Sequence, residues 1–179
     1  KADAVLCTFN GGMFGGQAVA EAAFGKLNPS GKLPISFPRH SGQLPVYYNQ
    51  LPGWHGGKYC DLPSAPLFAF GEGISYTSFE FSNLNFDKDS YTVTLDVENT
   101  GKCEGTETVQ LYLHDVVSSV MSVEKRLIAF KQLTLAPGKK QTVSINISRD
   151  AFALINTDCE EVVEPGDFVL MAGKSSKDE

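Results

Sequence analysis

Four carboxylates lie in the first 79 residues of this chain, and pairs of carboxylates are the groups that hydrolyse glycosidic bonds. Asp3 precedes an apolar run and Glu21 falls in a predicted helix, so we expect both to be solvated surface groups. Asp61 and Glu72 lie in a stretch rich in aromatic residues and are the more interesting candidates. A turn or a linker explains them more simply, so the sequence alone identifies no catalytic pair.

The glycine-rich stretch 11–16 follows an apolar run and precedes a predicted helix, a position where loops bind phosphate. It lacks the Lys-Ser/Thr pair of a P-loop and the G-x-G-x-x-G spacing of dinucleotide sites. A tight turn with close backbone packing explains it. No G-x-S-x-G turn occurs, which argues against a Ser-His-Asp triad. We therefore expect no nucleotide cofactor.

The cysteines and histidines are scattered, and no two cysteines have the spacing of metal ligands. We therefore expect no metal site. Cys7 lies in an apolar run and is predicted to be a buried thiol, and a Cys103–Cys159 disulfide is an option. Cysteines without an evident partner favour a reducing cytoplasm slightly over secretion, but the compartment stays unknown.

Residues 40–79 combine many aromatic side chains with glycines and show little periodicity. A loop of this length is expected to be functional or to pack against a neighbouring domain. Tyr47, Tyr48, Trp54 and His55 have the side chains to form the rim of a sugar site. The simpler alternative is that they attach the loop to another domain.

The elements that must position these side chains begin with a strand–loop–helix–strand pattern. Residues 4–9 form a near-continuous apolar run, which predicts a strand buried on both faces. Residues 17–24 predict a helix that Gly25 ends, and residues 33–38 predict a short edge strand. One such unit cannot bury both faces of a parallel sheet. We therefore expect the rest of this α/β layer to come from elsewhere, and residues 1–64 to expose apolar surface without it.

The second part of the chain alternates apolar and polar residues, as strands with one buried face do. The alternation covers residues 91–97, 108–113 and 141–147, with a last strand at 168–172 and turns at 99–101, 136–138 and 164–167. About seven short strands over ~100 residues are typical of an immunoglobulin-like or fibronectin type III-like sandwich. The predicted fold class is α+β overall, a partial α/β segment followed by an all-β sandwich.

The net charge of −6 and the pI of about 5.1 argue against a nucleic-acid-binding protein. No run approaches the roughly 20 apolar residues of a membrane helix. Residues 1–79 carry five basic and four acidic side chains and residues 80–179 carry ten and seventeen, which suggests a boundary near residue 80. The chain starts at Lys1, directly in a core-like run and without a signal peptide, so we expect it to be part of a longer protein.

A set of motifs covers nearly the whole chain: residues 15–25, 28–34, 36–39, 44–49 and 70–79, then 97–101, 109–112, 125–127 with Phe130, 137–138, 164–168 and 173–176. In this order the motifs resemble glycoside hydrolase family 3. A single Asn-Pro-Ser-Gly turn would be a weak signal, whereas the ordered set is a strong one.

The resemblance implies a C-terminal fragment of a retaining exo-β-glycosidase, similar to β-glucosidases and β-xylosidases, that hydrolyses terminal sugars from β-glycosides. It implies the end of an α/β sandwich domain in residues 1–64, a junction in 65–79 and a fibronectin type III-like β-sandwich in 80–179. The family's nucleophilic Asp and its acid/base Glu would both lie upstream. No catalytic residue and no cofactor is therefore expected here, and the segment alone would be structural and inactive.

The partners that the resemblance implies are the barrel and the upstream α/β domain of the same enzyme, with an oligosaccharide or aryl β-glycoside as substrate. Many family members carry an acidic residue where Phe14 stands, so Phe14 joins the four loop residues as a candidate for the sugar-site rim or an interdomain contact. Many also have Tyr where Glu72 stands, and a charge there is expected to change interdomain packing. A stand-alone carbohydrate- or protein-binding module and an inactive paralogue are the alternatives, and a homo-oligomer is compatible with the sequence.

Overall fold

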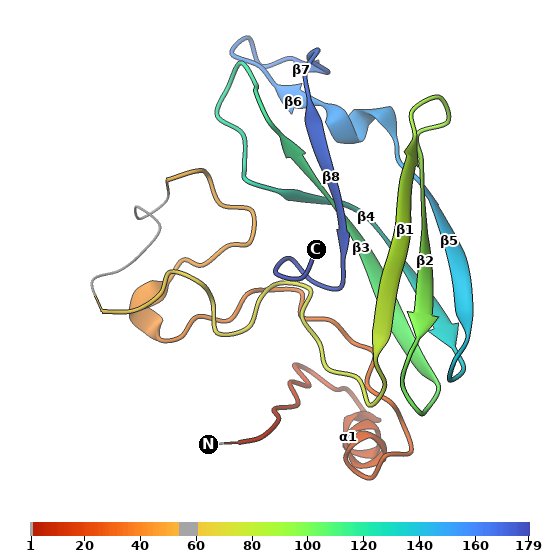
Figure 1. Cartoon of the computed structure of the whole chain (residues 1–179). Coiled ribbons are helices and arrows are strands. Elements are labelled where there is room, and N and C mark those ends of the chain that lie inside the picture. Colours follow the sequence, from red (N-terminus) through yellow and green to blue (C-terminus); the bar gives the residue numbers. More distant parts are fainter. Residues whose placement is uncertain (1, 54–60) are drawn as a thin grey trace.

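The computed structural model describes residues 2–53 and 61–179, and its main body is a β-sandwich (Figure 1). Within these residues a single α-helix, α1 (Gly15–Ala23), and the 3₁₀ turn η1 (Ser41–Gln43) precede the sandwich. The strands are β1 (Phe79–Asp87), β2 (Thr92–Asn99), β3 (Gly105–Asp115), β4 (Arg126–Leu135), β5 (Lys140–Asn146), β6 (Leu154–Ile155), β7 (Glu161–Val162) and β8 (Phe168–Gly173), with the 3₁₀ turn η3 (Arg149–Phe152) after β5.

Two antiparallel three-stranded sheets face each other across one core. Their strand orders are β1-β2-β5 and β4-β3-β8, and β6 and β7 form a small separate hairpin. Leu95 lies opposite Val143 in the first sheet and Leu111 lies opposite Ala172 in the second. The buried core consists of Phe79, Val93, Leu95, Val97, Val109, Leu111, Leu133, Leu135, Val143, Ile145 and Ile147. The predicted sandwich is confirmed.

β2 and β3 show how burial decides the sequence pattern of a strand. In β2 the side chains of Val93, Leu95 and Val97 are buried, and the intervening Thr94 and Asp96 are only partly covered. In β3 every residue from 107 to 113 is buried, because both faces of this strand are covered. The segment before the sandwich lies against its outer face.

The predicted helix is confirmed as α1, which starts two residues earlier than its pattern suggests. Gly25 follows with a φ of +73°, the left-handed conformation that commonly ends helices. Only Ala22 of the helix is buried. No helix in the described ranges is long and apolar enough to cross a membrane.

Both strands predicted before the sandwich are wrong. Residues 4–9 form no strand, and Cys7 is exposed rather than buried. Residues 33–38 contribute only an isolated bridge between Phe37 and Phe68. The apolar pattern was that of strands, but a strand needs hydrogen-bonded neighbours, and the described residues supply none to 4–9. Cys103 and Cys159 are free thiols and form no disulfide.

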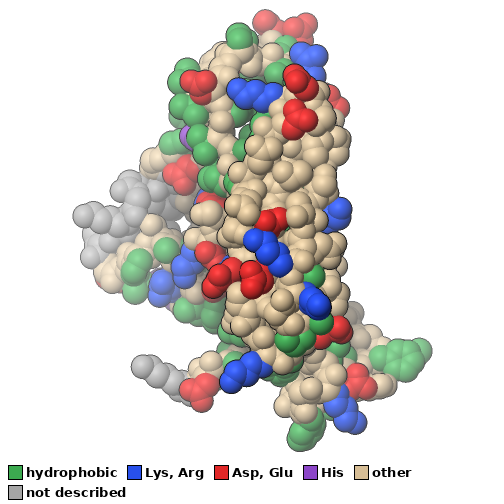
Figure 2. Space-filling view, turned by 45° about the vertical axis from the view of Figure 1, so that its right-hand side comes forward, with side chains coloured by type: hydrophobic (Ala, Val, Ile, Leu, Met, Phe, Trp, Pro, Cys, Tyr) green, Lys and Arg blue, Asp and Glu red, His purple; other side chains and the backbone are tan. Residues whose placement is uncertain are grey.

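The apolar surface expected in residues 1–64 is present. Phe14 is 71% exposed and Phe24 is 84% exposed. In Figure 2 hydrophobic side chains project from the lower end of the molecule, where α1 lies. The other large apolar side chains exposed in this part include Val5, Leu6, Phe9, Met13, Val19 and Leu27. A surface of this extent is typical of a face that another part of a protein covers.

A polar cluster on the outer face of the β1-β2-β5 sheet centres on Asp96. Its carboxylate accepts hydrogen bonds from Thr142 Oγ1 at 2.6 Å and Asn83 Nδ2 at 2.7 Å, and Lys140 Nζ lies 3.1 Å away. The Thr142 and Asn83 hydrogen bonds, in that order, and then Lys140 lower the pKa of Asp96 from 3.8 to about 2. The cluster therefore joins all three strands of the sheet through one ionised carboxylate.

We expect the acid sensitivity of the sandwich to change in Asp96→Asn. The folded pKa is depressed, so the contribution of Asp96 to stability is complete above about pH 4 and declines as the pH falls toward about 2. Urea unfolding should show Asp96→Asn less stable than the wild type at neutral pH, with the gap closing near about pH 2.5. Asp89→Asn, in the exposed β1–β2 turn, is the matched control. A gap independent of pH would contradict this role.

Candidate functional site

The loop that carries the predicted aromatic site is closed at its base by one buried amide. Gln43 is 3% exposed, and its Oε1 accepts a hydrogen bond from the backbone N–H of Arg39 at 2.7 Å. Its Nε2 donates to the carbonyls of Ser64 at 2.7 Å and Ala65 at 3.1 Å. Arg39 Nε also donates to the carbonyl of Ala65. These bonds hold the two ends of the loop together, as in compact surface loops that are often functional.

Tyr48 attaches this loop to the sandwich. Its ring stacks on Phe70 at a centroid distance of 4.1 Å and meets the edge of Tyr112 at 6.0 Å. Its hydroxyl accepts a hydrogen bond from the backbone N–H of Leu127 in β4. The ring of Tyr48 is therefore packed against other rings and joins the loop to β3 and β4.

The other candidates for the sugar-site rim lie in different settings. Tyr47 is 59% exposed, and its ring is available at the surface of the loop. Phe14 stands at the N-terminal cap of α1, outside the loop. Trp54 and His55 lie outside the described residues. The structure thus brings Tyr47 and Tyr48 together on one segment but does not bring Phe14 to them.

An open hollow of about 600 Å³, here called the aromatic hollow, lies beside Tyr47. It is lined by residues 34–36 and 44–49 and by Phe70, and all of these side chains except Ser36 and Asn49 are mainly apolar. Ile35, Leu44, Pro45, Tyr47, Tyr48 and Phe70 contribute to its wall. Such a surface suits an apolar partner or the face of a ring.

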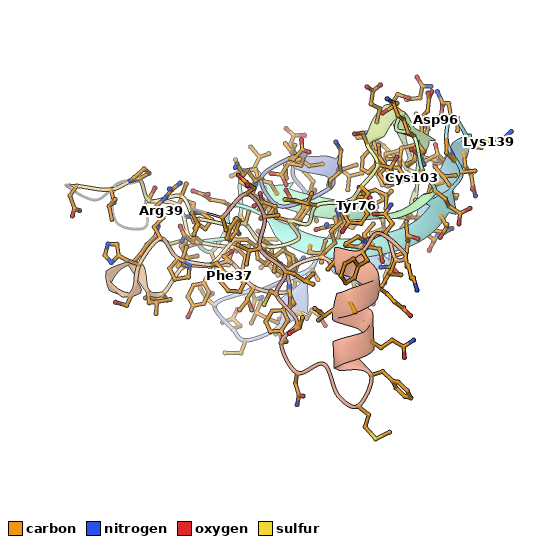
Figure 3. The ribbon with its side chains drawn as sticks, turned by 90° about the horizontal axis from the view of Figure 1, so that it is seen from below. Phe37, Arg39, Tyr76, Asp96, Cys103 and Lys139 are labelled. Atoms are coloured by element: carbon orange, nitrogen blue, oxygen red, sulfur yellow. The ribbon has the colours of Figure 1, made fainter. Side chains whose placement is uncertain are left out.

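A second set of contacts joins α1 and the following turn to the sandwich. Asn28 Oδ1 accepts hydrogen bonds from Ser75 Oγ at 3.0 Å and from the backbone N–H of Tyr76 at 2.8 Å. Its Nδ2 donates to the carbonyl of Glu104 at 2.9 Å. Tyr76 in turn donates from its hydroxyl to the carbonyl of Ala22, and Figure 3 shows Tyr76 beside α1. One amide therefore holds the helix turn, the junction and the start of β3 together.

A largely buried ion pair also joins the N-terminal part to β3. Lys32 Nζ is 2.6 Å from Glu107 Oε1, and the two side chains are 16% and 6% exposed. The backbone N–H of Thr108 also donates to Glu107 Oε1. Glu72 Oε2 accepts a hydrogen bond from the backbone N–H of Ala69 at 2.7 Å, so its carboxylate stabilises a turn of the junction.

Gln110 connects the junction to the end of the chain. Its Nε2 donates to the carbonyls of Gly71 at 3.1 Å and Lys174 at 2.6 Å, and its Oε1 accepts from the hydroxyl of Tyr112. Burial is the main cause that raises the pKa of Tyr112, which stays a neutral hydrogen-bond donor. Gly71 has a φ of +78°, and a Cβ there would collide with the Gln110 amide, so glycine is required.

The carboxylates considered from the sequence are not brought together as a catalytic pair. Asp3 and Asp61 are exposed, Glu21 accepts a hydrogen bond from Gln17, and Glu72 is occupied by the turn of the junction. The described residues contain no group of three or more His, Cys, Asp or Glu side chains that could hold a metal ion.

Comparison with known proteins assigns both parts of the chain. Residues 1–76 match the glycosyl hydrolase family 3 C-terminal domain, and residues 107–176 match the fibronectin type III-like domain. The chain is a C-terminal segment of a glycoside hydrolase family 3 protein. The motifs that resembled this family in the sequence are thereby confirmed.

The similar proteins in family 3 cover nearly all of this chain. It is 44% identical to a β-xylosidase of Formosa agariphila over 97% of its length and 40% identical to a periplasmic β-glucosidase of Salmonella typhimurium over 98%. A β-glucosidase involved in saponin metabolism from intestinal bacteria superposes with a TM-score of 0.86 at 43% identity, over 93% of this chain and 24% of that one. The chain spans about a quarter of the length of both sequence relatives.

Several residues that hold the N-terminal part of this family 3 segment in place carry no clear signal in the sequence. Lys32 was seen only as part of a motif, and no pattern marks Glu107 as its partner 75 residues later. Gln43 gave no signal, because a buried amide in a loop looks like any polar surface residue. Charged and amide residues inside an alternating strand, such as Glu107 and Gln110 in β3, are the available hint.

We expect Lys32→Met to loosen the attachment of the N-terminal part to the sandwich. Glu107 would keep a buried charge with only a backbone partner, which should lower the free energy of unfolding by about 2–3 kcal/mol, given the slight exposure of the pair. Hydrogen exchange of the Leu33 amide, which donates to the carbonyl of Glu72, should accelerate.

Lys26→Met, at an exposed lysine, is the matched control for this variant and should change stability by less than about 0.5 kcal/mol. Equal effects of the two substitutions would contradict the importance of the ion pair.

Proposed function

We propose that this chain is the C-terminal structural part of a retaining exo-β-glycosidase of the β-glucosidase or β-xylosidase type. The observation that carries the proposal is similarity over 97% and 98% of the chain to proteins named for these two activities. The whole enzyme would release terminal sugars from β-glycosides such as oligosaccharides or aryl β-glycosides.

Retaining hydrolysis needs two carboxyl groups about 5–5.5 Å apart, one as nucleophile and one as acid and base. The carboxylates of the N-terminal part are exposed or bonded to a backbone N–H or a glutamine side chain. We therefore place both catalytic groups in the part of the protein that precedes this chain. The contribution of the described residues is to hold the end of the α/β domain against the sandwich.

We propose a division of the chain into three parts, which its contacts support. We place the end of the α/β domain in residues 1–64, the junction in 65–79 and the β-sandwich in 80–179. The start of β1 at Phe79 and the hydrogen bonds of Asn28, Leu33 and Gln110 to residues 71–76 support these limits. Tyr47, with its exposed ring beside the aromatic hollow, is the best-placed described residue for a sugar-site rim or a contact with the upstream domain.

We expect the complete protein to hydrolyse aryl β-glucosides or aryl β-xylosides and the 179-residue chain to release no product under the same conditions. The measurement is the rate of phenol release by both, after mass spectrometry of each polypeptide. Turnover by the verified chain alone would overturn the proposal, and Asp61→Asn and Glu72→Gln would then be the first variants to test. An inactive complete protein would instead favour an inactive paralogue.

A further inference from the structure

A polar groove of about 580 Å³ runs between the N-terminal part and the sandwich, at the junction itself. Four segments that are distant in sequence form its walls. The residues that they contribute to the lining include Lys32, Glu72, Ile74, Glu107, Lys174 and Asp178. We call it the junction groove. Boundaries between domains are among the preferred places for small-molecule sites, because two rigid bodies there enclose a concave surface.

The charges of the side chains that line the junction groove balance, and five of the six side chains have a bonded partner. Lys32 is paired with Glu107 at 2.6 Å, Lys174 with Asp178 at 3.5 Å, and Glu72 is fixed by the N–H of Ala69. Lys177 also lines the groove, so three ammonium groups face three carboxylates. Near the centre of the face in Figure 2, acidic and basic side chains likewise lie side by side. Groups that are already oriented lose little freedom when they bind.

The geometry points to a neutral sugar unit as the ligand of the junction groove. Each lysine offers three N–H donors and each carboxylate about four acceptor positions, so the ion pairs leave donors and acceptors unused side by side. A sugar hydroxyl both donates and accepts, and vicinal hydroxyls match such alternating groups. The hydroxyls of Ser75, Ser78 and Ser175 extend the polar lining, and Ile74, 74% exposed, offers an apolar surface to the C–H face of a ring.

Other ligand classes fit this groove less well. A phosphate or sulfate needs an excess of positive charge, whereas the lining is balanced. An apolar ligand would displace water from the ammonium and carboxylate groups without offering hydrogen bonds to their remaining donors and acceptors. The inference goes beyond the glycosidase proposal and does not depend on which bond the complete protein cleaves.

The experiment is a ¹⁵N chemical-shift titration of the 179-residue chain with glucose, xylose, cellobiose and, separately, sulfate. Saturable shifts confined to the amides of residues 32, 72–75 and 174–178 are expected with a sugar. Binding of glucose or xylose would identify a free monosaccharide as the ligand, and binding of cellobiose alone would identify an oligosaccharide chain. Shifts with sulfate only, shifts elsewhere with sugar, or none that saturate would overturn the inference.

Two variants test which groups recognise the sugar. Glu72→Gln keeps an oxygen for the N–H of Ala69 but removes the charge, and it should weaken binding roughly five- to tenfold. Glu80→Gln removes an exposed carboxylate on β1 outside the groove and should leave the affinity unchanged. Lys177→Ala, at an exposed position where folding is not at stake, should also weaken binding. Equal affinities in all three variants would contradict the assignment.

Discussion

A strand without a neighbour cannot satisfy its backbone hydrogen bonds, and this constraint governs the first third of the chain. Residues 4–9 have the composition of a strand buried on both faces but lie exposed, and residues 33–38 form a single bridge. Their sequence encodes a sheet whose other strands these residues do not contain. The exposed apolar side chains around α1 follow from the same constraint, because the layer that would cover them is also absent from the described residues.

The sandwich, by contrast, pairs its own strands and buries its own core, and the N-terminal part packs against it. Its two sheets share one core, and its outer β4-β3-β8 face receives Tyr48, Gly71 and the end of the chain. Asn28 and the buried pair of Lys32 and Glu107 then fix the N-terminal part to the sandwich. In Figure 3, Phe37 and Arg39 lie on the arm that extends away from the sandwich, on the side opposite Asp96 and Lys139. The two ends of the loop are therefore joined by Gln43, and Tyr48 attaches the loop to the sandwich while the ring of Tyr47 stays exposed.

Features that depend on neighbouring residues could be predicted from the sequence, whereas features that depend on distant residues could not. The two-residue period of β2 and the helix stop at Gly25 depend on neighbouring residues, and both were predicted correctly. The burial of Glu107 and Gln110 depends on groups more than 30 residues away, and no local pattern reports it. Residues 4–9 show the reverse case, in which a correct local pattern is overridden because the tertiary partner is missing. The family motifs succeeded because they record whole tertiary arrangements in sequence order.

We expect residues 4–9 to form a strand only when the upstream chain is present. Hydrogen exchange measured by mass spectrometry on this chain and on the complete protein tests it most directly. The account predicts rapid exchange of these amides in the chain alone and strong protection in the complete protein. Protection already present in the isolated chain, or rapid exchange in both, would contradict it.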